Sequence, residues 1–300
     1  MLVLWKRKGL LNQWGGDNVS QRTVYTKYHE KMKKLLKGCD CGTFTFVPDS
    51  VFNDYGNYLM KAVGKESRFK LYRYSTLYYY DKEQKENRFS LDLEKLYFSP
   101  NGNLNDIFEG LPNDDMSIYP LEERLDKLSK IAALKCFTES FDNNLMWAHY
   151  SDSHKGICLE YDFKKINDDE ILKLLFPVIY SKERNIYASS DILIDFFNGD
   201  KELQGTKDAK GIFLQKDNCW RYEKEWRICL MNHSDEIDTV QEMEFPCVTA
   251  IYIGARTPKE DIEKIKYCVK EYEEKHKYTI KLYQMKLNDN SYDLIPKEIH

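Results

Sequence analysis

Short strand-like segments recur through the middle of the chain, and they constrain its fold more than any other feature. Several of them alternate apolar or aromatic side chains with polar ones, the period-two pattern typical of a strand with one buried face. Helical segments separate them, so the pattern predicts an α+β protein with a sheet at its centre. The segments lie at residues 70–77, 95–99, 134–138, 156–162 and 220–230.

The C-terminal part carries a clear strand–helix–strand pattern. Residues 248–254 are a continuous apolar run typical of a buried strand, and residues 278–287 indicate a second one. Thr257 and the Pro258 that follows it resemble a capping box with proline at the first helical position. The helix between the strands is predicted to bury one stripe of side chains, namely Ile262, Ile265, Cys268, Val269 and Tyr272.

Further helices are predicted where apolar residues recur at spacings of three and four among helix-forming residues. The first of these begins at Ser20 and is ended by Gly38. The predicted helices cover residues 20–37, the region of Leu59 to Val63, 121–133 and 144–150, with a short strand at 43–47. We therefore divide the chain into a mostly helical N-terminal extension, 1–69, and an α+β domain, 70–300.

The composition excludes several classes of protein. Of 300 residues, 42% are hydrophobic and the net charge is −4, so the chain can bury a core and lacks the excess of basic residues typical of non-specific nucleic-acid binding. No apolar stretch approaches the ~20 residues that cross a bilayer. The eight cysteines are scattered singly apart from Cys39 and Cys41. A cytoplasmic protein without a membrane partner is the expectation.

Tyrosine dominates an unusually aromatic composition. The chain has 22 tyrosines, and aromatic residues make up 14% of it. A tyrosine-rich, half-buried sheet surface accounts for this in the ordinary way. The alternative is a cleft lined with rings for a flat ligand such as a base or nicotinamide.

An ordered series of motifs resembles a bacterial family known only as domain-of-unknown-function family 2971. The resemblance extends over roughly residues 70–290, and the family name implies no activity. Its motifs in this chain are Tyr72-Arg-Tyr-Ser, Leu96-Tyr-Phe-Ser, Asn105-Asp with Glu109 behind it, Cys136-Phe-Thr-Glu-Ser, Met146-Trp-Ala-His-Tyr, His154-Lys-Gly-Ile-Cys-Leu-Glu-Tyr-Asp, Tyr222-Glu-Lys-Glu-Trp-Arg and Ile251-Tyr-Ile-Gly.

The order of these motifs also resembles the layout of ADP-ribosyltransferases, which hold NAD in a split sheet. That resemblance implies an arginine on the first strand, here Arg73, and a Glu-x-Glu motif, here Glu223 and Glu225. Thr138 and Ser140 correspond to the middle strand, where Thr-Glu-Ser replaces the Ser-Thr-Ser of the superfamily. The resemblance implies a split or mixed sheet flanked by helices.

The chemistry of cleaving the nicotinamide–ribose bond suits these residue types. Positive charge develops on the ribose, so a nearby carboxylate stabilises the transition state. On a strand, Glu223 and Glu225 would share one face about 7 Å apart. We expect Glu225 to stabilise the ribosyl cation, Glu223 to assist, and the planar fork of Arg73 to bind the pyrophosphate. The remaining residues assigned to NAD binding are Tyr72, Tyr74, Ser75, Trp147 and Tyr150.

Structural explanations compete with each of these assignments. Glu223 and Glu225 with neighbouring arginines are also typical of a solvated charge ladder across strands. Arg73 would then be a surface ion-pair partner. Trp147 and Trp226 are more typical of core anchors than of ligand platforms.

Two histidines close in sequence, His149 and His154, suggest further roles. His149 is a candidate to hydrogen-bond substrate or another catalytic residue, and a half-buried structural histidine is the alternative. With Asp142 and Asp152, the histidines give a third hypothesis, a metal-dependent nuclease. The spacing supplies few fixed ligands, so no metal is expected.

The resulting expectation is an NAD-dependent ADP-ribosyltransferase, or an NAD glycohydrolase with water as acceptor. Such enzymes in bacteria often act as toxins or anti-phage effectors, which implies a protein or nucleic-acid acceptor and an antitoxin or defence-system partner. The alternative from another class is a non-catalytic module of a defence system that binds a nucleotide or a partner. No glycine-rich phosphate loop is present to indicate a nucleoside triphosphatase or dehydrogenase.

Overall fold

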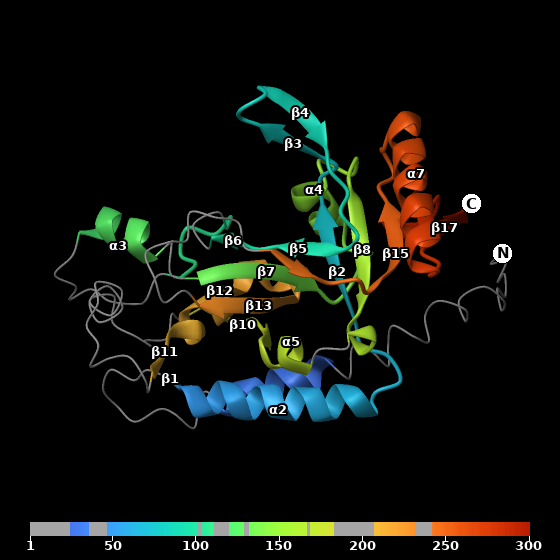
Figure 1. Cartoon of the computed structure of the whole chain (residues 1–300). Helices are drawn as coiled ribbons and strands as arrows, with labels where there is room; N and C mark the ends of the chain where they lie inside the picture. The colour runs from blue at the N-terminus through green and yellow to red at the C-terminus, as the bar shows by residue number, and fades with distance from the viewer. Residues whose placement is uncertain are drawn as a thin grey trace, which may run out of the picture.

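A computed structural model describes residues 25–35, 47–100, 104–110, 120–128, 132–166, 169–182, 207–231 and 242–300. Their centre is a nine-stranded mixed sheet in which only β15 and β16 run parallel (Figure 1). The strand order is β17 (Leu294–Ile299), β16 (Lys281–Leu287), β15 (Val248–Ile253), β8 (Ile157–Asp162), β2 (Lys70–Ser75), β7 (Ala132–Thr138), β13 (Glu225–Met231) and β9 (Leu175–Pro177), with β6 (Ser99–Pro100) beside β7.

Short two-stranded pairs and helices surround this sheet, which confirms the α+β class. The pairs are β1 (Val47–Pro48) with β11 (Lys207–Asp208), β10 (Ile179–Ser181) with β12 (Gln215–Asp217), β14 (Glu242–Glu244) with β5 (Lys95–Tyr97), and β3 (Tyr78–Asp81) with β4 (Glu86–Phe89). The helices are a segment at 25–35, α2 (Asp49–Lys65), α3 (Leu121–Leu128), α4 (Asn144–Tyr150), α5 (Asp169–Lys173) and α7 (Lys259–His276).

The C-terminal strand–helix–strand unit forms as predicted, except at the start of the helix. α7 connects the parallel strands β15 and β16 and buries Ile262, Ile265, Val269 and Tyr272 against the sheet, whereas Cys268 is half-buried. The predicted capping box is wrong. The Thr257 hydroxyl donates to the carbonyl of Lys155, 2.8 Å away, and Pro258 is the N-cap residue without a side-chain cap.

The described part of the predicted N-terminal extension packs directly on the sheet. In the helix at 25–35, Tyr25 and Tyr28 are buried with their rings edge-on to Trp226 of β13. In α2, Phe52 packs edge-on against Phe176 of β9. The rest of the predicted helix at 20–37, with Gly38 and nearly all of the predicted strand at 43–47, lies outside the described residues. These helices therefore share one core with the strands.

One edge of β7 is open over three residues, and this opening places the site. β2 pairs with β7 at a single position, Tyr72 opposite Thr138, and β6 pairs with it again at Leu134 and Ala133. Between these two contacts, residues 135–137 have no strand partner on that edge among the residues that the structure describes, although β13 pairs with the whole of the other edge. The sheet is thus split between β2 and β7.

Several segments differ from their prediction. Ala132 and Ala133, predicted to end a helix, begin β7. Residues 218–223 are a 3-10 helix, η4 (Asn218–Glu223), and only the part from Glu225 onward is strand, so the long alternation at 220–230 overstates β13. The β3–β4 hairpin, which the sequence analysis did not identify, projects away from the sheet (Figure 1).

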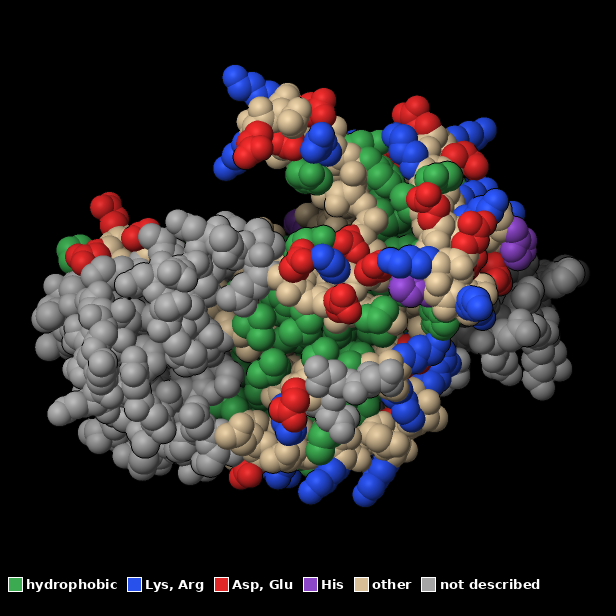
Figure 2. Space-filling model, viewed as in Figure 1, with side chains coloured by type: hydrophobic (Ala, Val, Ile, Leu, Met, Phe, Trp, Pro, Cys, Tyr) green, Lys and Arg blue, Asp and Glu red, His purple; other side chains and the backbone are tan. Residues whose placement is uncertain are grey.

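Charge is spread over the outer elements in both signs. Figure 2 shows lysine and arginine side chains interspersed with aspartate and glutamate over the hairpin and α7. The described helices include none with the length and apolarity that a membrane crossing requires.

Candidate functional site

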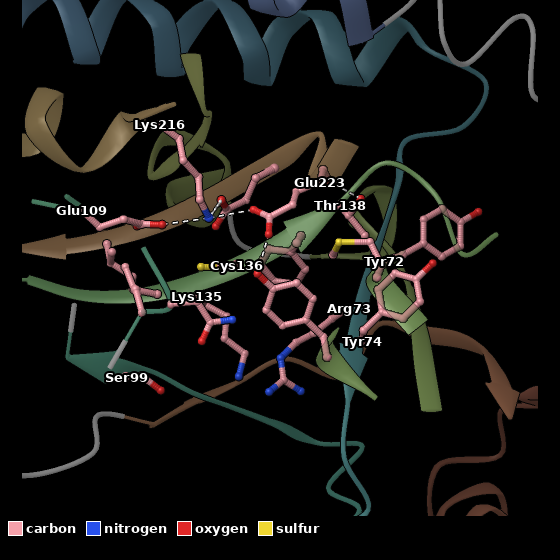
Figure 3. A pocket seen from close by; sticks show the side chains of 17 residues that line it. Tyr72, Arg73, Tyr74, Ser99, Glu109, Lys135, Cys136, Thr138, Lys216 and Glu223 are labelled. Atoms are coloured by element: carbon pink, nitrogen blue, oxygen red, sulfur yellow. Dashed lines mark hydrogen bonds and ion pairs between the residues drawn. The ribbon is translucent and has the colours of Figure 1, made fainter. Parts of the chain in front are cut away.

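A pocket of about 310 Å³ opens where β2 and β7 separate (Figure 3). Residues on both strands line it, including Tyr72, Arg73 and Tyr74 from β2 and Lys135 and Thr138 from β7. Side chains alternate along each strand, so Tyr72, Tyr74 and Thr138 lie on one face of the sheet while Arg73 and Lys135 lie on the other. The pocket therefore receives side chains from both faces of the split sheet.

Three buried carboxylates converge at one end of this pocket, which we call the carboxylate end. The ammonium group of Lys216 lies 2.7 Å from Glu223, 2.8 Å from Glu109 and 3.2 Å from Glu225. Figure 3 shows Glu109 and Glu223 reaching Lys216 from opposite sides. Glu223 and Glu225 are 2% and 5% exposed, so the alternative of a solvated charge ladder is wrong.

The chain brings Glu223 and Glu225 together through a turn rather than along a strand. Asp217 caps η4 by accepting from the backbone N–H of Cys219, 2.7 Å away. Lys224 then adopts the left-handed conformation, with φ of 45°, and β13 begins at the next residue. The predicted geometry of two glutamates on one strand face is therefore wrong, although a shared lysine still brings the two carboxylates close together.

Arg227 supplies the second cation of the carboxylate end. Its guanidinium makes a two-pronged contact with Glu225, at 2.8 and 2.9 Å, and lies 2.6 Å from Glu109. A third donor reaches the carbonyl of Phe213, also at 2.6 Å. Three carboxylates against two cations leave one net negative charge in a site from which water is largely excluded.

This environment moves the pKa values of the glutamates in opposite directions. Burial alone would raise the pKa of Glu225, but Arg227 and Lys216 together outweigh it and lower that pKa to about 2. Burial and the neighbouring charge of Glu225 raise the pKa of Glu223. Burial likewise raises the pKa of Glu109. One carboxylate is thus held ionised beside another that accepts a proton more readily.

Two further pocket residues hold Glu223 in place. The hydroxyl of Tyr150, on α4, donates to the carboxylate of Glu223. The hydroxyl of Thr138, on β7, donates to the backbone carbonyl of Glu223 at 2.5 Å. Both residues were predicted to belong to the site, and the structure places both in the lining of the pocket.

The opposite end of the pocket, which we call the cation end, holds Arg73 and Lys135. Figure 3 shows both side chains extending away from the carboxylate end, toward the side on which Ser99 lies. Lys135 is 6% exposed, and its ammonium group donates to the carbonyl of Tyr97 at 2.7 Å. Burial, reinforced by the charge of Arg73, lowers the pKa of Lys135 to about 6.

Cys136 lies between the two ends. Its side chain is half-buried and lines the pocket. Burial and the charge of Glu225 raise the pKa of its thiol well above the ordinary value, which disfavours the thiolate.

Other predicted site residues lie outside the pocket lining. Trp147 is fully buried, its indole N–H donates to the carbonyl of Phe141, and its ring meets Tyr74 edge-on, as expected of a core anchor. Ser75 ends β2 and Ser140 follows β7, and neither lines the pocket. Tyr74, which does line it, donates its hydroxyl to the carbonyl of Ser140 at 3.1 Å.

The histidines predicted as ligands or catalytic groups do not converge. His149 is exposed on α4, with its ring 6.3 Å from that of Tyr222. His154 stacks over Trp147 and follows Asp152 in a turn of left-handed residues. Across the residues that the structure describes, no three His, Cys, Asp or Glu side chains gather in a way that would hold a metal ion.

Glu139, which has no counterpart in the resembled motif, makes structural contacts. Its carboxylate accepts from the indole of Trp226 and contacts His29 of the N-terminal helix, each at 3.0 Å. The residue therefore links the end of β7 to the helix at 25–35.

Lys135, Lys216 and Arg227 belong to the site although the sequence pattern did not predict a role for them there. Lys135 follows Leu134 in an otherwise apolar strand, and Arg227 lies between Trp226 and Ile228. A charged residue enclosed by apolar neighbours in a predicted strand was the available signal. Lys216 lies in β12, a short strand that the sequence pattern does not mark.

Residues 146–228 match the model of a family described as "Protein of unknown function (DUF2971)". The match includes Tyr150, Lys216, Glu223, Glu225 and Arg227, which form most of the carboxylate end. No curated protein matches the chain, and neither does any solved structure.

Proposed function

We propose that the pocket binds NAD and that the protein cleaves the nicotinamide–ribose bond, as an ADP-ribosyltransferase or an NAD glycohydrolase. One observation carries this proposal: the sheet splits between β2 and β7, and the split holds carboxylates at one end and cations at the other. A ligand with a sugar that becomes cationic and a phosphate that is anionic matches both ends.

Glu225 suits the part of electrostatic stabiliser. Its lowered pKa keeps the carboxylate ionised, and its contacts with Arg227 and Lys216 fix its position before substrate arrives. Positive charge that develops on the ribose would meet an oriented carboxylate in a site of low polarity, where such an interaction is strong.

Glu223 suits the part of general base. Its raised pKa lies closer to neutrality than that of an exposed glutamate, which favours proton transfer from an acceptor hydroxyl or from water. Tyr150 and Thr138 hold it in the pocket wall. Arg73 at the other end is placed to bind phosphate, and Tyr72 and Tyr74 line the space between.

The acceptor decides the biological role. With a protein or nucleic acid as acceptor, the activity would be that of a toxin or an anti-phage effector controlled by an antitoxin or another defence partner. With water as acceptor, the protein would deplete NAD. Both reactions release nicotinamide, so one assay tests them together.

The test is nicotinamide release from NAD by the purified protein, followed by chromatography, with and without cell extract as acceptor. We expect release by the wild type and a loss of at least about a hundredfold in Glu223→Gln. Glu86→Gln, on the exposed β4, is the matched control and should remain active. If the folded wild type releases no nicotinamide with any acceptor, the proposal is overturned.

A non-catalytic binding module is the second candidate. It is favoured by the complete pairing of the carboxylates at the carboxylate end with cations of the protein. Every carboxylate there already contacts Lys216 or Arg227, so the network is complete without turnover. Binding of NAD without nicotinamide release would support this candidate over the enzyme.

A further inference from the structure

We propose that Lys135 and Arg73 together form a subsite for the diphosphate of the dinucleotide, and that Lys135 takes up a proton when the diphosphate binds. The choice of a dinucleotide rests on the proposed function. The pairing of these two residues rests on the geometry of the cation end, and the proton that accompanies binding rests on the burial of Lys135 beside Arg73.

Charge compensation separates the two ends of the pocket. Glu109, Glu223 and Glu225 are the pocket carboxylates, and Lys216 and Arg227 engage all three. Neither Arg73 nor Lys135 has an acidic partner among the residues that the structure describes. Two basic groups directed into one half-enclosed space without a counter-anion are a site for an anionic ligand.

The groups around the Lys135 ammonium come from β2, β5 and β7. The neighbouring groups that influence its ammonium are Arg73 from β2 and Cys136 on its own strand, and its hydrogen bond goes to a neutral carbonyl in β5. The other titratable side chains of the pocket belong to the network at the carboxylate end or are tyrosines, namely Glu109, Lys216, Glu223, Glu225, Tyr72, Tyr74 and Tyr150.

Binding of a diphosphate changes the protonation state of Lys135. With a pKa near 6, the amine of Lys135 is largely neutral in the empty pocket at neutral pH. A diphosphate beside it reverses the balance, because an opposite charge within about 4–6 Å favours the protonated form. Solvent supplies the proton. The empty pocket thereby avoids holding two adjacent buried positive charges.

Calorimetric titration of the full-length protein with ADP-ribose, in two buffers of different protonation enthalpy, tests this. At about pH 7.5 we expect uptake of about one proton per ADP-ribose, falling toward zero at about pH 5, where Lys135 is already charged. Nicotinamide riboside with a free 5′-hydroxyl, which lacks phosphate, should bind without proton uptake.

Lys135→Met keeps the volume of the side chain and removes the titrating group. It should abolish proton uptake and weaken ADP-ribose binding by at least about tenfold. Lys82→Met, at an exposed position of the hairpin turn, is the matched control and should retain both properties. The two-buffer measurement on the wild type stands by itself if Lys135→Met fails to fold.

Binding of ADP-ribose by the wild type without proton uptake would overturn the proposal, as would no binding at all or unchanged uptake in Lys135→Met. The result is separable from the proposed function. Proton-coupled binding without nicotinamide release leaves this subsite standing and removes the enzyme, whereas nicotinamide release without proton uptake does the opposite.

Discussion

The two ends of the pocket hold charge in different ways. At the carboxylate end, Glu225 and its neighbours meet Lys216 and Arg227 at hydrogen-bonding distance, so nearly every charge is compensated within the protein. At the cation end, Lys135 and Arg73 have no such acidic partner in the described chain. The difference predicts that the paired charges of the carboxylate end contribute to the stability of the fold, whereas the cation end keeps unpaired charge that the proposed diphosphate would compensate.

Removal of Arg227 should destabilise the carboxylate end more than any other single substitution there. Arg227→Met leaves Glu109 and Glu225 buried with only Lys216 for compensation, and we expect unfolding to become easier by about 3–5 kcal/mol. Urea denaturation measures the change. Arg88→Met, in the solvent-exposed ion pairs of the hairpin, should leave the urea midpoint essentially unchanged. A similarly small loss of stability in both variants would show that the buried carboxylates do not depend on Arg227 for charge compensation.

Removal of Lys135 should instead stabilise the folded protein. Its folded pKa, about 6, lies below the ordinary 10.5, so between these values the unfolded chain holds a proton that the folded chain lacks. Stability therefore rises with pH through this window, and the lysine costs stability at neutral pH. Lys135→Met should stabilise the protein by about 4–5 kcal/mol at pH 7, with the gain vanishing near pH 10.5. Denaturation curves across pH test this, and a pH-independent gain would contradict it.

Glu225→Gln should cost about 3 kcal/mol at neutral pH, because the folded pKa of Glu225 is lowered to about 2 by Arg227 and Lys216. The contribution is fully present above the ordinary value of 4.5 and is lost as pH falls toward 2. Glu223→Gln should cost less, since the pKa of Glu223 is raised and its ionised form is less favoured in the folded state. Equal losses in the two variants would mean that the two carboxylates share their environment.

The smallest effect on stability is expected for Arg73→Met. The side chain is half-buried and has no acidic partner in the described chain, so the free energy of unfolding should change by less than about 0.5 kcal/mol. Binding of ADP-ribose should nevertheless be lost. A stability loss of more than about 1 kcal/mol would assign Arg73 a structural role and weaken the contrast between the two ends.

Local periodicity predicted the elements that depend on it. The stripe of α7, the strands around Tyr72 and Leu159, and the short helix at 144–150 all form, because their apolar spacing matches the face that they bury. The boundary before Glu225 was missed because alternation continues through η4, where Asp217 caps a 3-10 turn and overrides it.

For a related reason, only some of the residues of the site could be predicted from the sequence. The glutamates stand in a recognisable motif, so both could be named, but their convergence depends on Lys216, which reaches them from another strand. The open edge of β7 depends on where β2 and β6 end their pairing, which no spacing within one segment encodes. For this reason the sequence pattern predicted only a strand at Lys135 and no role in a site.

The packing of the helix at 25–35 on Trp226 has a consequence for the order in which the chain becomes structured. Tyr25 and Tyr28 leave the ribosome long before the tryptophan that covers them, about 200 residues later, which corresponds to roughly 10–40 s of synthesis. Phe69, which also meets both rings, emerges much earlier, but the face of the helix that contacts Trp226 lacks this partner throughout the interval. We expect the packing of this helix on the sheet to be completed only after β13 has emerged.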